Sequence, residues 1–146
     1  MSKRNKALVS RIWNEIWNEG ALGVCNEVFA PEYVGCIPGM QQPVRGPEEF
    51  KQLVAVYRNA FPDVHLTVED VFADGDRVAV RWTSRGTHRG ELMGIPPTGR
   101  PIAIMGISLF QIKDGKIVCE WEGFDTMGMM QQLGLGGGNA PASESK

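Results

Sequence analysis

The spacing of apolar residues changes at Val64, and this change constrains the fold more than any other feature of the sequence. Before Val64 apolar side chains recur at helical spacing, and after it they alternate with polar ones as in strands. One helical stripe runs from Leu8 to Trp17, and another runs from Phe50 to Phe61. Helices gathered early and strands gathered late are typical of an α+β fold with helices on one face of a sheet.

Turn-forming residues divide the chain into its expected elements. The first three helices are expected to end at Gly20, Pro31 and Pro62, and the third to open at Gly46-Pro47. We expect a short strand over 33–37, long strands from 64, over 77–87, 101–112 and 117–124, and a last helix over 126–133. Four long strands beside three helices must curve around them, which leaves a conical cavity of the kind that binds small ligands.

Composition excludes several classes of function. The 146 residues suit one domain, which we place at 1–134, followed by a flexible Gly-rich tail over 135–146. A net charge of −2 argues against nucleic-acid binding, and no apolar run is long enough to span a membrane. Three cysteines without a CxxC pair predict neither a disulfide framework nor a zinc site, and favour a cytoplasmic location. The sequence also lacks the phosphate-binding, dinucleotide-binding, zinc-protease and serine-nucleophile motifs.

Several motifs resemble those of a known family. They are Trp17-Asn18-Glu19-Gly20, Gly46-Pro47-Glu48-Glu49-Phe50, the segment from Gly86 to Gly99, Asp114-Gly115-Lys116-Ile117, Glu120-Trp121-Glu122, Asp125 and Gln132-Leu133-Gly134. Together they resemble the SnoaL-like polyketide cyclase group of the nuclear transport factor two-like superfamily, over roughly residues 5–134. The resemblance implies a cone-shaped, curved antiparallel sheet wrapped around three N-terminal helices, also called a cystatin-like roll. It also implies a homodimer that binds a mostly apolar ring system.

The resemblance further implies a reaction without a metal or organic cofactor. In the family's cyclases an acidic side chain on the last long strand moves a proton during an intramolecular aldol closure. The family's Asp at this position corresponds here to Glu122, and the histidine that partners it would fall near Ser108. Glu122 is therefore the first candidate for a catalytic residue.

The alternation of residues around Glu122 leaves its orientation open. Glu120 and Glu122 share one face of the expected strand with Phe124, and Trp121 lies on the other face. If the acids face the cavity, desolvation raises their pKa and suits them to proton transfer near neutral pH. The alternative is that both acids face solvent and Trp121 faces the core.

Two further residues are candidates for assisting Glu122. His88 has the parity of Val78, Val80 and Trp82, so it could act as a base in the cavity, or it could bond only to its own loop. Asp125 is equally suited to assist catalysis or to cap the final helix. The other histidine, His65, is expected at the surface.

Arg81 and Arg85 lie on the opposite face of the same strand and carry an alternative function. If that face pointed inward, Arg81 could pair with Glu120 or Glu122 and position water, as in a hydrolase. Otherwise both arginines are solvated or lie at a dimer interface.

Aromatic and polar side chains are expected to line the ligand cavity, although each could be simple core. Methionines near Met93 and over 127–130 could form an adaptable lid. The residues that we expect to bind substrate are Trp17, Asn18, Tyr33, Tyr57, Trp82, Met93, Ser108, Phe110 and Phe124.

The sequence thus favours a cofactor-independent acid/base enzyme, with no metal site, that acts on a small, mostly apolar carbonyl compound. The expected partners are a small apolar or aromatic ligand and a second copy of the chain, without nucleic acid or membrane. Two alternatives stay open, namely a hydrolase or hydroxylase on the same scaffold, and a non-catalytic ligand-binding or dimerising domain.

Overall fold

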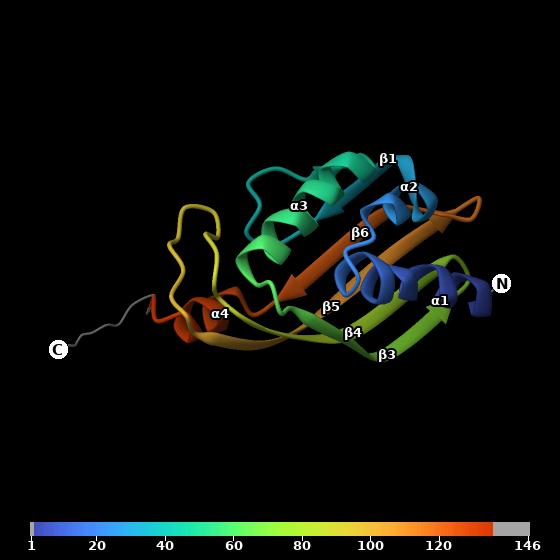
Figure 1. The fold of residues 1–146 in the computed structure, drawn as a ribbon. Helices are drawn as coiled ribbons and strands as arrows, with labels where there is room; N and C mark the ends of the chain where they lie inside the picture. Colours follow the sequence, from blue (N-terminus) through green and yellow to red (C-terminus); the bar gives the residue numbers. More distant parts are fainter. Residues whose placement is uncertain (1, 136–146) are drawn as a thin grey trace.

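A curved six-stranded sheet with helices over one face dominates the computed structural model, which describes residues 2–135 (Figure 1). The sheet order is β2-β1-β6-β5-β4-β3. Its strands are β1 (Phe29–Cys36), β2 (Val44–Arg45), β3 (His65–Asp74), β4 (Arg77–Thr87), β5 (Pro101–Lys113) and β6 (Lys116–Phe124). Except for Leu135, the tail predicted over 135–146 lies outside the described residues.

The α+β class and the curved sheet are confirmed, but the sheet is mixed rather than wholly antiparallel. β1 runs parallel to β6, with Val34 opposite Cys119 and Cys36 opposite Trp121. The two strands are separated by most of the chain, so no hairpin turn forces them to run in opposite directions. This pairing brings Tyr33 of β1 next to the candidate acids of β6.

The N-terminal helical region differs in detail from its prediction. α1 (Ser2–Arg11) continues as a six-residue π-helix, η1 (Ile12–Trp17), and a short 3₁₀ turn, η2 (Leu22–Val24), leads into α2 (Cys25–Val28). The second helix was expected to reach Pro31, but β1 already begins at Phe29. Pro31 is tolerated because the pairing of β1 with β6 is irregular between Phe29 and Val34, where no ladder N–H is needed.

The remaining helices follow the sequence signals closely. α3 (Gly46–Ala60) has Pro47 in its first turn and buries Phe50, Leu53 and Val54 against the sheet. α4 (Thr126–Gln132) lies at the far end of the sheet from the N-terminus (Figure 1). Within residues 2–135 no helix combines the length and the hydropathy that crossing a bilayer requires.

The main core fills the space between the helices and the inner face of the sheet. In β4, Val78, Val80 and Trp82 are buried while Arg81 between them is exposed, which confirms the predicted alternation. A second, smaller core lies under α4 and the loop before β5. It consists of Ala60, Phe61, Leu92, Ile102, Met129 and Leu133.

Candidate active site

An apolar cavity lies between the helices and the inner face of the sheet. It offers about 60 Å³ to the centres of water molecules, enough for several waters or part of a small ligand. The π-helix contributes Ile12, Trp13 and Trp17 to its wall. π-Helical turns are rare and are frequent at functional sites, and no signal in the sequence reveals this one.

Two carboxylic acids, Glu120 and Glu122, are the acidic side chains among the residues that line this cavity. They project from β6 on the same face, and Glu120 is only 3% exposed. Trp121 between them is 45% exposed on the opposite face. The alternative with Trp121 in the core and the acids in solvent is therefore wrong.

A chain of hydrogen bonds holds the two acids in place. The Tyr33 hydroxyl donates to Glu120 Oε1 at 2.7 Å, and the Ser108 hydroxyl donates to Glu122 Oε1 at 3.3 Å. The indole N–H of Trp82 donates to Ser108 Oγ at 3.0 Å and orients that hydroxyl. Gly106, opposite Trp82 in β5, makes room for the indole, because a Cβ there would lie 2.3 Å from the ring.

Burial dominates the electrostatics of this pair. Desolvation and the neighbouring charge of Glu122 raise the pKa of Glu120 well above its ordinary value. Desolvation also raises the pKa of Glu122, against the hydrogen bonds from Glu120 and Ser108, which lower it. No Lys, Arg or His side chain is found among the described residues that line the cavity. Both pKa shifts therefore move these carboxyl groups toward the pH range in which a side chain can accept and release a proton during catalysis.

Of the residues expected to bind substrate, four line the cavity and two stand behind the acids. Trp17, Tyr57, Trp82 and Phe124 form part of the wall. Tyr33 and Ser108 are buried and reach the cavity through their hydrogen bonds to Glu120 and Glu122.

The other three expected contacts lie elsewhere. Asn18 clamps the backbone of Leu66, with its amide bonded to both the N–H and the C=O at 2.8 Å. Phe110 is fully buried in the core, edge-on to Trp13. Met93 is outside the main cavity and lines a neighbouring one.

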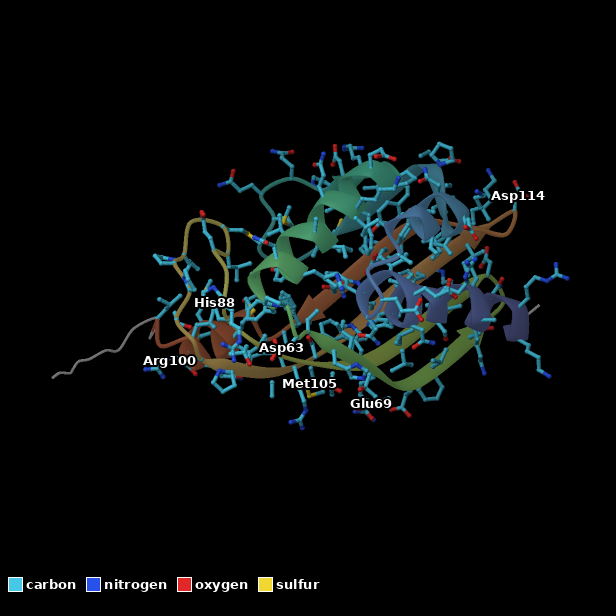
Figure 2. All side chains as sticks on the ribbon, viewed as in Figure 1. Asp63, Glu69, His88, Arg100, Met105 and Asp114 are labelled. Carbon is cyan, nitrogen blue, oxygen red and sulfur yellow. The ribbon has the colours of Figure 1, made fainter. Side chains whose placement is uncertain are left out.

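His88 is held by its own loop rather than by the acids. It is fully buried, its Nδ1 accepts a hydrogen bond from the Thr98 N–H at 3.2 Å, and its ring packs on Phe61. Figure 2 shows His88 near Arg100 at the base of the loop, where its backbone N–H donates to the Arg100 carbonyl. The prediction from side-chain parity that His88 is buried is confirmed. The strand ends at Thr87, however, and the His88 ring lies against Thr98 instead of in the cavity.

Asp125 and the two arginines also have structural roles. The Asp125 carboxylate accepts the Gly128 N–H at 2.8 Å and caps α4. Arg81 pairs with Asp70 at 2.7 Å on the exposed side of the sheet, and Arg85 is exposed as well. The hypothesis that Arg81 pairs with Glu120 or Glu122 is therefore wrong. His65 is exposed, as expected.

A second cavity of about 90 Å³ adjoins the first and shares Tyr57, Phe124 and Met129 with it. Its outer wall comes from the 38–39 loop, from Leu92, Met93 and Ile95, and from Met130 of α4. The methionine-rich cover expected over the site thus corresponds to the wall of this second cavity. Met127 is 65% exposed and takes no part in it.

Over residues 2–135 no three His, Cys, Asp or Glu side chains lie close enough together to hold a metal ion. The chemistry that the side chains of the cavity can supply is proton transfer in a desolvated, apolar pocket.

Comparisons with known proteins point in the same direction as the geometry. The sequence model of the SnoaL-like polyketide cyclase family matches residues 7–133. Aklanonic acid methyl ester cyclase DnrD of Streptomyces peucetius is 33% identical over 124 residues, which cover 82% of this chain and 84% of the relative.

Solved structures agree with the sequence relatives. A candidate SnoaL-like polyketide cyclase from Jannaschia sp. CCS1 superposes with a TM-score of 0.83 and 27% identity, over 90% of this chain and 92% of that one. IdmH of Streptomyces antibioticus, a candidate polyketide cyclase, gives a TM-score of 0.77 and 34% identity, over 89% and 98% of the two chains.

Proposed function

Because the chain belongs to the SnoaL-like polyketide cyclase family, we propose that it closes a ring in a polyketide by an intramolecular aldol reaction, with Glu122 as the residue that moves the proton. The observation that carries this proposal is the pair of carboxyl groups at the wall of an apolar cavity that, within residues 2–135, has no basic side chain in its lining. General acid/base catalysis needs a group that both accepts and releases a proton at working pH, and desolvation raises the pKa of the half-buried Glu122 in the direction that favours this.

The proposed reaction uses one proton and returns it. The Glu122 carboxylate removes a proton from a carbon next to a carbonyl group, which leaves an enolate. The enolate carbon attacks a second carbonyl of the same molecule, so that one carbon–carbon bond forms and an alkoxide appears. Glu122 then protonates the alkoxide and regains its starting state, so the product is an isomer of the substrate.

Aromatic polyketide methyl esters are the substrate class that we propose. The curated relatives are named as cyclases of aklanonic and nogalonic acid methyl esters. Flat, apolar rings suit the aromatic wall of the main cavity. Such a ligand is larger than that cavity alone, so we propose that it also occupies the second cavity, across Tyr57, Phe124 and Met129.

Incubation of the purified protein with aklanonic acid methyl ester tests this function. We expect a product of unchanged mass and altered retention in liquid chromatography coupled to mass spectrometry. A gain of one water would indicate hydrolysis, and a gain of one oxygen would indicate hydroxylation. Either outcome, or no conversion of this ester and of nogalonic acid methyl ester, would contradict the proposal.

The outer face of the sheet supports the proposal that the protein is a homodimer. Met105, Ile107 and Trp121 are each about half exposed there, and Figure 2 shows Met105 on the side of the sheet away from the helices. Trp121 lies opposite Leu109 in the register, beside Ile107, so these side chains form one apolar surface. Apolar surfaces of this kind mark interaction sites, and a second copy of the chain is the proposed occupant.

We also propose a reducing compartment such as the cytoplasm for this protein. Cys25, Cys36 and Cys119 are all unpaired thiols. Cys25 is buried, and its burial raises its pKa to about 11, so it packs as an apolar residue.

A further inference from the structure

Glu120 is the second carboxyl group of the cavity, and the aldol cycle described above does not require it. It is 3% exposed and lies on the same face of β6 as Glu122, two residues away. Burying an ionisable group without a role is costly, and an apolar side chain of similar size would fill the space at no such cost. A specific task for Glu120 would account for its presence.

The hydrogen bond from Tyr33 fixes how Glu120 can act. The phenol has one proton to donate, and it donates it to Glu120 Oε1, so this oxygen is an acceptor. A proton on the Glu120 carboxyl group must therefore sit on the other oxygen. Glu122 in turn accepts from Ser108 through its own Oε1.

Gly35 adds to the case that the contact between Tyr33 and Glu120 is built into the fold. It lies opposite Glu120 in the parallel pairing of β1 with β6. A Cβ at position 35 would lie 2.2 Å from the Tyr33 hydroxyl oxygen. Only glycine therefore leaves the phenol free to reach the carboxyl group.

We propose that Glu120 and Glu122 form a carboxyl dyad that shares one proton, in which Glu120 is a positioning residue that donates its proton to the Glu122 carboxylate. Tyr33 orients Glu120 from one side, and Ser108 supplies a second donor to Glu122 from the other. This inference rests on the proposed function, and it identifies the protonation state in which Glu122 acts as the base.

The groups around the dyad allow only one of its two carboxyl groups to be ionised. The titratable groups that face it are Tyr57 from α3 and Tyr33 from β1, with the Cys25 thiol of α2 behind Tyr33. None of them is a cation, so two ionised carboxylates would repel without compensation. Glu120 is 3% exposed and Glu122 is half-buried, so a negative charge is better solvated on Glu122, and Glu120 is the member that keeps the proton.

This arrangement predicts two limbs in the pH–rate profile. Activity rises as the pair loses its first proton and Glu122 becomes a base. It falls again when the second proton leaves and the dyad carries two charges. Such a profile reports the pair as a unit rather than either residue alone.

Carboxyl titration of the ligand-free protein, followed by ¹³C NMR on glutamate-labelled samples, tests the dyad independently of any substrate. We expect coupled, two-step titration of the Glu120 and Glu122 resonances. In Glu120→Gln the amide still donates to Glu122, so the lower step stays and the upper step disappears. Glu32→Gln, at an exposed position of β1, is the matched control and leaves both steps in place. Independent single-step titration of Glu120 and Glu122 would overturn the dyad.

The Tyr33→Phe variant tests the dyad in a second way, because it should keep the upper titration step and move it to a different pH. The Tyr33 hydrogen bond lowers the pKa of Glu120, so its loss moves the upper step to higher pH. If Tyr33→Phe does not fold, Gly35→Ala displaces the hydroxyl and makes the same prediction. An upper step that stays in place in the variant that folds contradicts the proposed role of Tyr33, and with it the dyad's orientation.

The two proposals fail in different ways. If Glu120 and Glu122 titrate as a coupled pair but the protein does not convert polyketide esters, the proposed dyad would stand and the proposed cyclase function would be wrong. If the protein converts polyketide esters and the Glu120→Gln variant keeps the alkaline limb of the pH–rate profile, the proposed cyclase function would stand and the proposed dyad would be wrong.

Discussion

Three neighbouring residues determine the position and the pKa of the Glu122 carboxyl group. Ser108 and Glu120 hold the carboxylate, and Trp82 holds Ser108 through the indole N–H. The family resemblance predicts a histidine near position 108, where this chain has the hydroxyl group of Ser108. In the family the catalytic acid is partnered by a histidine. In this chain Glu122 is instead accompanied by Ser108 and by a second acid, Glu120.

Replacement of Ser108 by alanine tests this environment. The Ser108 hydrogen bond lowers the pKa of Glu122, so its loss raises that pKa and moves the acid limb of the pH–rate profile to higher pH. The Trp82 indole N–H also loses its acceptor, which costs about 1–3 kcal/mol of unfolding free energy. The pH dependence of kcat/KM and chemical denaturation measure the two effects. Ser10→Ala in α1, outside the cavity, serves as the control, and an unshifted acid limb in Ser108→Ala would refute the assignment.

At the scale of elements, periodicity predicted most of what positions the site. Strict alternation in β6 placed Glu120, Glu122 and Phe124 on one face, and α3 opened at Gly46-Pro47 as expected. Alternation is reliable there because one face of the sheet is buried against helices and the other is not. The side-chain parity of Glu120 was therefore visible in the sequence, whereas its contact with Tyr33 was not.

Three features of the elements escaped prediction for physical reasons. The parallel pairing of β1 with β6 depends on contacts between distant segments, and so does the early start of β1 at Phe29. The π-helix over Ile12–Trp17 has the same apolar spacing as an α-helix. The direction of the His88 ring depends on a loop beyond the end of its strand, where parity no longer applies.

The backbone of the 92–95 turn, beside the second cavity, is strained at Met93. Leu92 and Ile95 bridge across it, and Met93 has a φ of +47°, which is unfavourable for a side chain of this kind. Asparagine tolerates this conformation better, so we expect Met93→Asn to stabilise the fold by up to about 1 kcal/mol. Met93 also lines the second cavity, so the same change should raise KM for a polyketide ester. Thermal unfolding and steady-state kinetics measure both, and an unchanged KM would remove this turn from the binding site.

At the scale of the whole molecule, the two faces of the sheet have different tasks. The inner face supplies the acids, and the outer face presents Met105, Ile107 and Trp121 to solvent. Because alternate residues of β6 point to the two faces, the proposed dimer would hold in place the strand that carries Glu120 and Glu122.

If the proposed dimer forms through this surface, Ile107→Glu is expected to make the protein monomeric, because the substitution places a charge in the centre of the apolar surface. Analytical ultracentrifugation measures the change, and Gln52→Glu on the exposed side of α3 is the control. A wild-type protein that is monomeric at micromolar concentration, or an Ile107→Glu variant that stays dimeric, would contradict the proposed interface.

The buried acids also make stability depend on pH. Their pKa values are raised in the folded state, so the fold binds more protons than the unfolded chain, and stability falls as pH rises above the ordinary value of about 4.5. Glu120→Gln removes one such group. We expect its melting temperature to exceed that of the wild type at neutral and alkaline pH, with the difference vanishing in acid. A constant difference across the pH range would show that Glu120 does not titrate upward.

Turnover of a polyketide methyl ester by Glu122→Gln, set against ester binding by the same variant, tests the account most directly. Glutamine keeps the shape of the side chain but cannot carry the proton. We predict that conversion to the isomeric product falls by about 10²–10⁴-fold, the range that general acid/base catalysis contributes, while the dissociation constant for the ester stays within a few-fold of wild type. Conversion at the wild-type rate would mean that the proton moves through another group and that Glu122 is not the catalytic acid.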